Sequence, residues 1–128
     1  MSNLKLMIGD WVMCKGFTRM FQADEIFKNG IRLVDKFGRI VIAPYSNIQP
    51  IPLTPEILEK VEGCEKCFRI DNFGEYKECY EVVFALGLMI RHNSYYIDWI
   101  GGNTEVKYLH TLQQVIRLFT KKEIEIKW

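Results

Sequence analysis

The dipeptide Asn29-Gly30 constrains the fold of this chain more than any other feature of its sequence. It lies between two runs of strand-forming residues, 20–27 and 30–35, and Asn-Gly in that position is the strongest short-range signal for a β-hairpin. A third run, 39–43, follows after a short break at 35–38. Polar residues interrupt the apolar ones in these runs, as half-buried strands require. The sequence therefore predicts an antiparallel sheet that begins as a meander.

Two further runs complete the predicted sheet. The segment 8–14 is rich in strand formers, and a single turn at 44–48 precedes another apolar run at 50–53. Prolines flank Ile51 on both sides, which confines this last strand to a sheet edge because proline has no N–H to donate. Five short strands within 8–53, with a turn before the fifth, predict a small SH3-like barrel of five strands.

A helix is predicted to open the second half of the chain. Thr54 can cap the free N–H groups of its first turn, and Pro55 fits the first helical position. Glu56 complements the positive end of the helix dipole. We expect this helix to be short and to end at Gly63.

Beyond it, the sequence predicts an antiparallel meander, a second helix and a closing strand. The helix is predicted at Tyr108–Phe119, where Leu109, Leu112 and Ile116 recur at helical spacing. The closing strand is predicted at 124–128, where apolar and charged residues alternate. The meander comprises the runs 67–71, 79–84, 88–92 and 95–100, separated by breakers at Gly74, Gly87, Asn93-Ser94 and Gly101-Gly102-Asn103.

The predicted class is therefore α+β. We expect an SH3-like barrel subdomain at 1–53, packed as one unit with the helix, antiparallel strands, helix and closing strand of 54–128. A chain of 128 residues, of which 48% are hydrophobic, is long enough for one domain or two very small ones sharing a core.

The start of the chain lacks the apolar core and cleavage site of a secretory signal, and no apolar run approaches the roughly 20 residues of a membrane helix. Four cysteines without a signal are typical of reduced thiols. We expect a cytoplasmic protein with no membrane partner.

The net charge of +1 gives no strong overall attraction to nucleic acid. The charge is unevenly distributed, however. Residues 1–53 carry seven basic and four acidic side chains, whereas residues 54–128 carry ten basic and twelve acidic ones.

Two segments carry a resemblance to a known family. They are Pro-Ile-Pro-Leu-Thr-Pro-Glu-Ile-Leu-Glu-Lys at 50–60 and Tyr-Leu-His-Thr-Leu-Gln at 108–113. Together they resemble an uncharacterised family of small proteins from gut anaerobes, their phages and mobile elements. The resemblance runs from Gly9-Asp10 to Glu123-Ile124 and implies no function, because the family has none assigned. Where this chain has Gly63-Cys64, the family pattern has glycine and an aromatic residue, so the cysteine there is not a family feature.

Motifs for catalysis, cofactors and metals are weak in this sequence. No serine or cysteine stands in a nucleophile elbow, and no glycine-rich phosphate loop is present. Cys64 and Cys67 have the spacing of half a zinc site, and Cys79 could supply a third thiolate. The other candidate ligands are scattered, so these cysteines are more simply small hydrophobic residues. We expect a protein that is not an enzyme and that has no metal and no cofactor.

The polar stripe of the second predicted helix is the first candidate site. If the apolar side of the helix packs on the sheet, the opposite side faces water or a partner. Glutamine and arginine exchange hydrogen bonds readily with another protein, and histidine changes charge near neutral pH. The sequence thus favours a non-enzymatic accessory protein that acts as a protein-interaction module. We expect a phage or a mobile element as its source. The residues of this stripe are His110, Gln113, Gln114 and Arg117.

An alternative site lies in the loops of the predicted barrel. Small barrels bind nucleic acid through exposed aromatic rings that stack on bases, with basic residues along the backbone, so the alternative is a weak nucleic-acid-binding protein that uses the barrel loops. We expect Trp11 and Tyr45 to belong to the core. The candidate nucleic-acid-binding residues are Lys15, Phe17, Arg19, Lys36, Phe37 and Arg39.

Overall fold

A computed structural model describes residues 5–70, 73–74, 76–82, 89–91, 96–99 and 102–128. The chain divides into two compact units. Unit 1 comprises residues 1–52 and 108–114, and unit 2 comprises residues 53–107 and 115–128. The first boundary, between residues 52 and 53, lies one residue from the expected boundary between 53 and 54. Residues 108–114 belong to unit 1, whereas they were expected to belong with residues 54–128.

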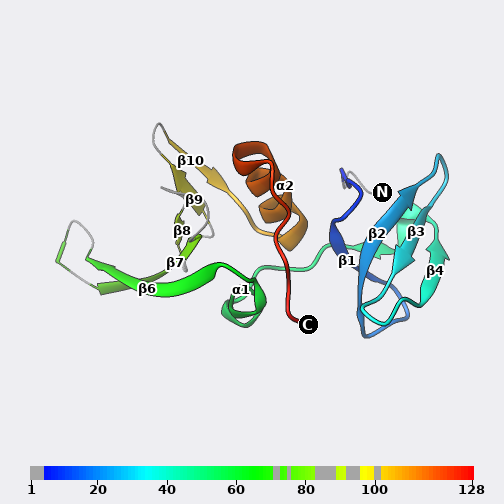
Figure 1. Ribbon diagram of the computed structural model, residues 1–128, viewed down its shortest axis with the longest axis horizontal. Helices are drawn as coiled ribbons and strands as arrows, with labels where there is room; N and C mark the ends of the chain where they lie inside the picture. Colours follow the sequence, from blue (N-terminus) through cyan, green and yellow to red (C-terminus); the bar gives the residue numbers. More distant parts are fainter. Residues whose placement is uncertain (1–4, 71–72, 75, 83–88, 92–95, 100–101) are drawn as a thin grey trace. The chain divides into compact units, whose positions relative to one another are not determined.

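Unit 1 is built on a curled antiparallel sheet of five strands in the order β4-β3-β2-β1-β5 (Figure 1). This confirms the small α+β class and the five-stranded sheet. A 3-10 helix, η1, precedes β5, as the predicted turn at 44–48 indicated. The elements are β1 (Trp11–Cys14), β2 (Met20–Ile26), β3 (Ile31–Val34), β4 (Ile40–Ala43), η1 (Tyr45–Asn47) and β5 (Ile48–Gln49).

The hairpin predicted at Asn29-Gly30 joins β2 to β3. Ile26 pairs with Ile31, and the Phe27 N–H donates to the Gly30 carbonyl over 2.8 Å. A Cβ atom on residue 30 would lie 2.8 Å from the carbonyl oxygen of Ala43, which is closer than real Cβ contacts. Glycine is therefore required here by the close approach of β4 and not by a left-handed backbone.

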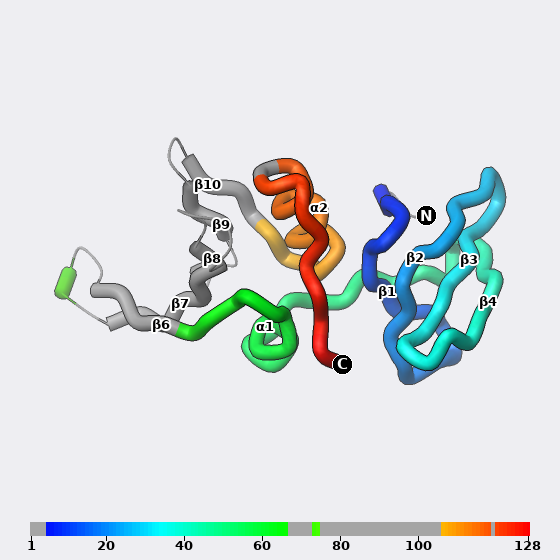
Figure 2. Tube along the Cα trace, viewed as in Figure 1, coloured from blue at the N-terminus to red at the C-terminus, as the bar shows by residue number. Residues whose placement is uncertain are grey.

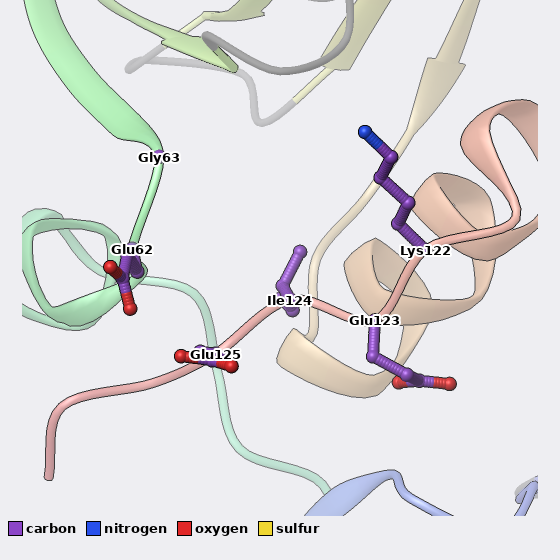
Figure 3. A pocket seen from close by; sticks show the side chains of 6 residues that line it. All are labelled: Glu62, Gly63, Lys122, Glu123, Ile124 and Glu125. Atoms are coloured by element: carbon purple, nitrogen blue, oxygen red, sulfur yellow. The ribbon is translucent and has the colours of Figure 1, made fainter.

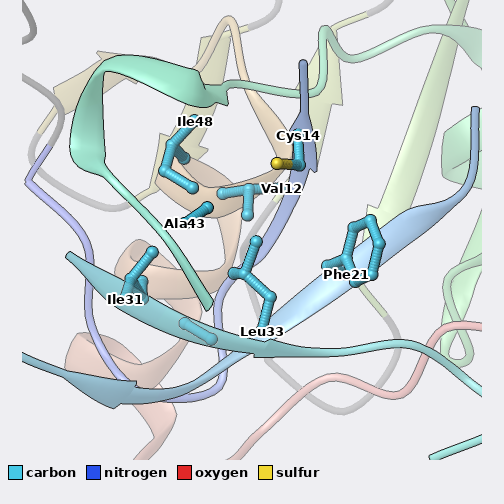
Figure 4. Packing of buried hydrophobic residues seen from close by; sticks show 8 residues of the cluster. Val12, Cys14, Phe21, Ile31, Leu33, Ala43 and Ile48 are labelled. Atoms are coloured by element: carbon cyan, nitrogen blue, oxygen red, sulfur yellow. The ribbon is translucent and has the colours of Figure 1, made fainter. Parts of the chain in front are cut away.

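The core of unit 1 lies on the concave side of the sheet. Alternate residues of each strand point inward, as the period of two in a strand demands. Figure 4 shows their side chains gathered around a common centre, from β1, β2, β3, β4 and β5. The members are Val12, Cys14, Phe21, Ala23, Ile31, Leu33, Ala43 and Ile48.

The predicted fifth strand at 50–53 is wrong in position. The strand is Ile48–Gln49, which pairs with β1, and the residues after it bond elsewhere. The Leu109 N–H donates to the Ile51 carbonyl over 2.8 Å, and Pro52 forms a bridge with Tyr108. Prolines on both sides of Ile51 remove the N–H groups that a ladder with β1 would use.

Gln113 links the second helix, α2 (Leu109–Thr120), to the start of the sheet within unit 1. The Trp11 N–H donates to Gln113 Oε1 over 2.8 Å, and Gln113 Nε2 donates to the Gly9 carbonyl over 2.9 Å. Its side chain is fully buried. A buried amide that bonds backbone groups on both its atoms satisfies them where water cannot reach.

Unit 2 begins with the predicted short helix, α1 (Pro55–Lys60). The Thr54 hydroxyl accepts a hydrogen bond from the Ile57 N–H, and Pro55 occupies the first turn, as the capping pattern predicted. Ile57 and Leu58 are buried. The helix ends at Lys60, three residues before Gly63. Val61 is its C-cap, and the Val61 N–H donates to the Leu58 carbonyl.

A second antiparallel sheet of five strands follows, in the order β10-β9-β8-β7-β6. The predicted meander is confirmed, but Gly102 and Asn103, predicted as breakers, begin a strand that pairs with Trp99 and Asp98. The ladder hydrogen bonds override the low strand propensity of these two residues. The strands are β6 (Cys64–Ile70), β7 (Tyr76–Val82), β8 (Met89–Arg91), β9 (Tyr96–Trp99) and β10 (Gly102–Glu105).

The C-terminal segment runs beside the end of α1, also in unit 2 (Figure 2). The Glu62 N–H donates to the Glu125 carbonyl, and the Lys127 N–H donates to the Lys60 carbonyl, each over 2.7 Å. The predicted closing strand thus forms a single bridge, Val61 to Ile126, rather than a full strand.

Neither helix of the described residues has the length and hydropathy that a membrane crossing requires.

We predict that Gln113→Leu destabilises the protein by about 1–3 kcal/mol, because the buried Trp11 N–H loses its acceptor while the volume changes little. Urea denaturation measures this free energy. Gln49→Leu, at an exposed position of β5, is the matched control and should change it by less than about 0.5 kcal/mol. Equal stability of the two variants would show that the buried amide contributes nothing.

Candidate nucleic-acid interface

Two turns of unit 1 meet at one end of its sheet. In an antiparallel meander the first and third connections lie at the same end, because the strands alternate in direction. Here they are the β1–β2 turn, residues 15–19, and the β3–β4 turn, residues 35–39. These two turns carry all six side chains predicted to form the nucleic-acid alternative.

The carboxylate of Asp35 organises both turns. Its Oδ1 accepts hydrogen bonds from the N–H groups of Phe37 and Arg39, each over 2.9 Å. Its Oδ2 lies 2.8 Å from Arg39 Nε and 2.8 Å from Arg19 Nε. The β3–β4 turn is closed by Gly38, whose φ of 84° suits glycine. One side chain therefore holds arginines from two turns.

Asp35 is buried by the groups that bind it, and its side chain is 1% exposed. This burial acts to raise the pKa of the carboxyl group, but hydrogen bonds from the Arg39 and Phe37 N–H groups and the charge of Arg39 outweigh it. The pKa of Asp35 is lowered below its ordinary value as a result. Asp35 is thus ionised at neutral pH.

Aromatic rings lie against these cations. The Arg19 guanidinium carbon is 4.8 Å from the ring centroids of both Phe17 and Phe21, which pack edge to face 5.3 Å apart. At Phe37, Lys36 Nζ and the Arg39 guanidinium carbon are each 5.1 Å from the centroid. Cation–π attraction of this kind helps to hold the guanidinium groups in place.

The cluster of Lys15, Phe17, Arg19, Asp35, Lys36, Phe37 and Arg39 is called the turn cluster below. It sets four cations against one carboxylate, so its charge is strongly positive for its size. Phe37 is 70% exposed and Phe17 is 38% exposed. A positive, partly aromatic surface of this kind can bind phosphates and bases.

Sequence reasoning missed two residues of this arrangement, Asp35 and Phe21. Asp35 stands first in a turn that ends in glycine, a position where its side chain commonly bonds the following N–H groups. That signal could have identified it. Phe21 is a core residue whose ring lies under the Arg19 guanidinium and packs edge to face with Phe17, and nothing in the sequence distinguishes it from other core aromatics.

The polar stripe of α2 is placed differently from its prediction. His110 and Gln113 are buried, not solvated, and Gln114 Nε2 donates to Asp10 Oδ2 over 2.7 Å and to the Lys5 carbonyl over 2.9 Å. Arg117 forms an ion pair with Glu123. The expectation that this stripe faces water is therefore wrong for His110 and Gln113, because the first turns of α2 pack on residues 5–11.

His110 stacks on Tyr108, with ring centroids 5.8 Å apart. Burial lowers the pKa of His110 from its ordinary value, although the negative charge of Asp10 acts in the opposite direction. The ring is therefore neutral at neutral pH, and its role as a charge-changing partner contact lacks support.

The cysteines show no zinc geometry among the described side chains. Cys64 and Cys67 lie in one extended strand, β6, whereas zinc-binding pairs of this spacing sit on a tight turn. The side chains of Cys67 and Cys79 lie outside the described part of the structure. No group of three or more potential metal ligands occurs among the described residues.

A shallow pocket of about 290 Å³ occurs in unit 2 (Figure 3). Glu62, Glu123 and Glu125 surround it, together with Lys122 and Ile124. The three carboxylates are exposed to water, so the pocket lacks the desolvated polar groups of a built site. We read it as a solvated acidic surface.

No protein-family model matches this sequence, and neither a curated protein nor a solved structure is significantly similar to it.

We predict that Asp35→Asn lowers the urea midpoint at pH 7, because both arginines lose their counter-charge. A carboxyl group whose pKa is lowered by folding stabilises the folded state at every pH above its ordinary pKa, which is 3.8 for Asp35. This stabilisation is lost as the pH falls from that value through the lowered pKa of the folded state. The wild type should therefore lose stability more steeply than the variant below about pH 4. Asp24→Asn is the control, since Asp24 forms a more exposed pair with Arg32 and should contribute less. Identical acid profiles of wild type and Asp35→Asn would refute the role of Asp35.

Proposed function

We propose that unit 1 is a nucleic-acid-binding module and that the turn cluster is its binding surface. The observation that carries this proposal is the shared carboxylate of Asp35, which holds Arg19 and Arg39 next to the exposed ring of Phe37. Cations fixed beside an exposed aromatic ring match the two parts of a nucleotide, its phosphate and its base. The small net charge of the whole chain is compatible with weak binding.

We further propose that the sheet of unit 1 is an SH3-like barrel. The strand order β4-β3-β2-β1-β5 and the 3-10 helix ahead of β5 support this assignment. In such a small barrel the turns at one end form a compact surface on a rigid scaffold, which is where binding residues concentrate. The turn cluster occupies such an end.

The proposal includes a setting for this activity. We place the chain in the cytoplasm as an accessory protein without catalytic activity, related to small proteins of gut anaerobes, their phages and mobile elements. The support is in the sequence: reduced-thiol cysteine usage, weak catalytic motifs, and the segments 50–60 and 108–113.

A protein-interaction face on α2 is the weaker candidate. Of its four predicted residues, His110 and Gln113 are buried, and Gln114 is bonded to residues 5 and 10. A partner would have to displace these contacts before it reached the stripe. At the turn cluster, Phe37 is already 70% exposed, so a ligand can reach it without breaking buried contacts.

The test is fluorescence anisotropy with a labelled thymidine oligonucleotide at several salt concentrations. We predict binding that weakens with salt and a slope that becomes shallower by about 0.7 for each phosphate contact removed. Lys15→Gln/Lys36→Gln is the variant of choice, because the contacts of Asp35 involve neither lysine, and its urea midpoint checks that it is folded. It should reduce both the affinity and the slope.

The matched control is Lys28→Gln/Lys127→Gln, which removes the same charge outside the turn cluster and should leave the affinity nearly unchanged. Equal losses in the two variants would assign binding to net charge alone. If the wild type does not bind the thymidine oligonucleotide at about 20 mM salt, the proposed function is wrong.

A further inference from the structure

Arg19 and Arg39 form a pair of guanidinium groups fixed by one oxygen atom. Each Nε lies 2.8 Å from Asp35 Oδ2, so the two Nε atoms are at most twice that distance apart. Two positive charges at this separation repel each other, and Asp35 compensates only one of them. The pair therefore carries an excess positive charge at a defined place.

The outer edges of both guanidinium groups remain available. Arg39 donates a hydrogen bond to Asp35 from Nε, and Arg19 contacts the same carboxylate oxygen through Nε as an ion pair without hydrogen-bond geometry. Among the described residues, the Nη groups of both arginines have no hydrogen-bond acceptor. Guanidinium Nη groups bind phosphate oxygens with a planar fork that an ammonium group lacks. An anion with several oxygens and one negative charge, such as a phosphodiester, matches both the geometry and the charge of the pair.

The two exposed rings of the turn cluster differ in their freedom to stack. Phe17 packs against Phe21 and under Arg19, which leaves it 38% exposed. Phe37 lies at the tip of the β3–β4 turn and is 70% exposed. Lys36 Nζ and the Arg39 guanidinium carbon each lie 5.1 Å from its centroid, and a contact of this exposed kind, such as that of Lys36, is weak enough for a base to displace. Phe37 is therefore the stacking ring, and Phe17 serves to support Arg19.

We infer that the turn cluster binds one nucleotide unit of a single strand, with a phosphodiester on the Arg19–Arg39 pair and a neighbouring base stacked on Phe37. This inference rests on the proposed function and specifies its ligand. A single strand is favoured over a duplex because stacking requires an open base face, which neighbouring pairs cover in a duplex. The hairpins that end in these turns also belong to a five-stranded sheet, so they are not the free helix or two-stranded ribbon that enters a major groove.

The test removes the base and the ring separately and together. Two labelled oligomers of about eight units are compared, one of thymidine and one fully abasic with the same phosphates. The wild type should bind the thymidine oligomer roughly fivefold or more tightly than the abasic one. Phe37→Leu should bind both oligomers equally, with the affinity that the wild type has for the abasic one. A duplex of the same length should bind no more tightly than the abasic oligomer.

Phe73→Leu is the matched control, since Phe73 is 90% exposed in unit 2, and it should leave the wild-type ratio unchanged. Arg39→Lys keeps the charge but loses the fork, so it should weaken binding of both oligomers by a similar factor and preserve their ratio. Urea midpoints show that each variant is folded.

The outcomes separate the two proposals. If the wild type binds both oligomers equally, if Phe37→Leu keeps the preference for bases, or if the duplex binds best, the single-strand inference is wrong while nucleic-acid binding stands. If neither oligomer binds at low salt, the proposed function fails and the inference fails with it.

Discussion

The carboxylate of Asp35 is the interaction on which the binding end of unit 1 depends. It closes the β3–β4 turn through two N–H groups and reaches the β1–β2 turn through Arg19. Without it, two arginines would stand close together with no counter-charge, and the turn would lose the bonds that fix Phe37 at its tip. Burial of an acid is costly, and here four nitrogen donors or cations offset that cost. Asp35 thus orders both turns and also brings together two arginines, whose combined positive charge exceeds its own negative charge.

The parts of the fold that follow local rules could be predicted from the sequence. Asn29-Gly30 placed a hairpin, and Thr54-Pro55 placed the start of α1, because each depends on residues close in sequence. The fifth strand and β10 could not be placed in the same way. Residue 51 bonds to residue 109, and Gly102 joins a ladder in spite of its low propensity. Tertiary contacts decide such segments, and a single sequence does not display them.

The candidate sites show the same division. The turn cluster could be predicted because alternate turns of a meander lie at the same end, so that residues 15–19 and 35–39 had to be neighbours. The polar stripe on α2 could not be evaluated, because composition does not distinguish a glutamine that faces water from one that bonds buried backbone groups. Gln113 is of the second kind. Exposed Phe37 and buried Phe21 are likewise alike in sequence, and only the structure separates a stacking ring from a core ring.

The hydrogen bond between the Trp11 N–H and Gln113 can form only late in the synthesis of the chain. The two residues are 102 positions apart, so the sheet of unit 1 is translated long before the amide that completes its first strand. At ordinary rates of translation this interval is roughly 5–20 s. During it, the Trp11 N–H must be satisfied by water or by another group of the nascent chain. A ribosome that pauses before codon 113 prolongs that state, and a message truncated there yields a chain whose first strand never receives its partner.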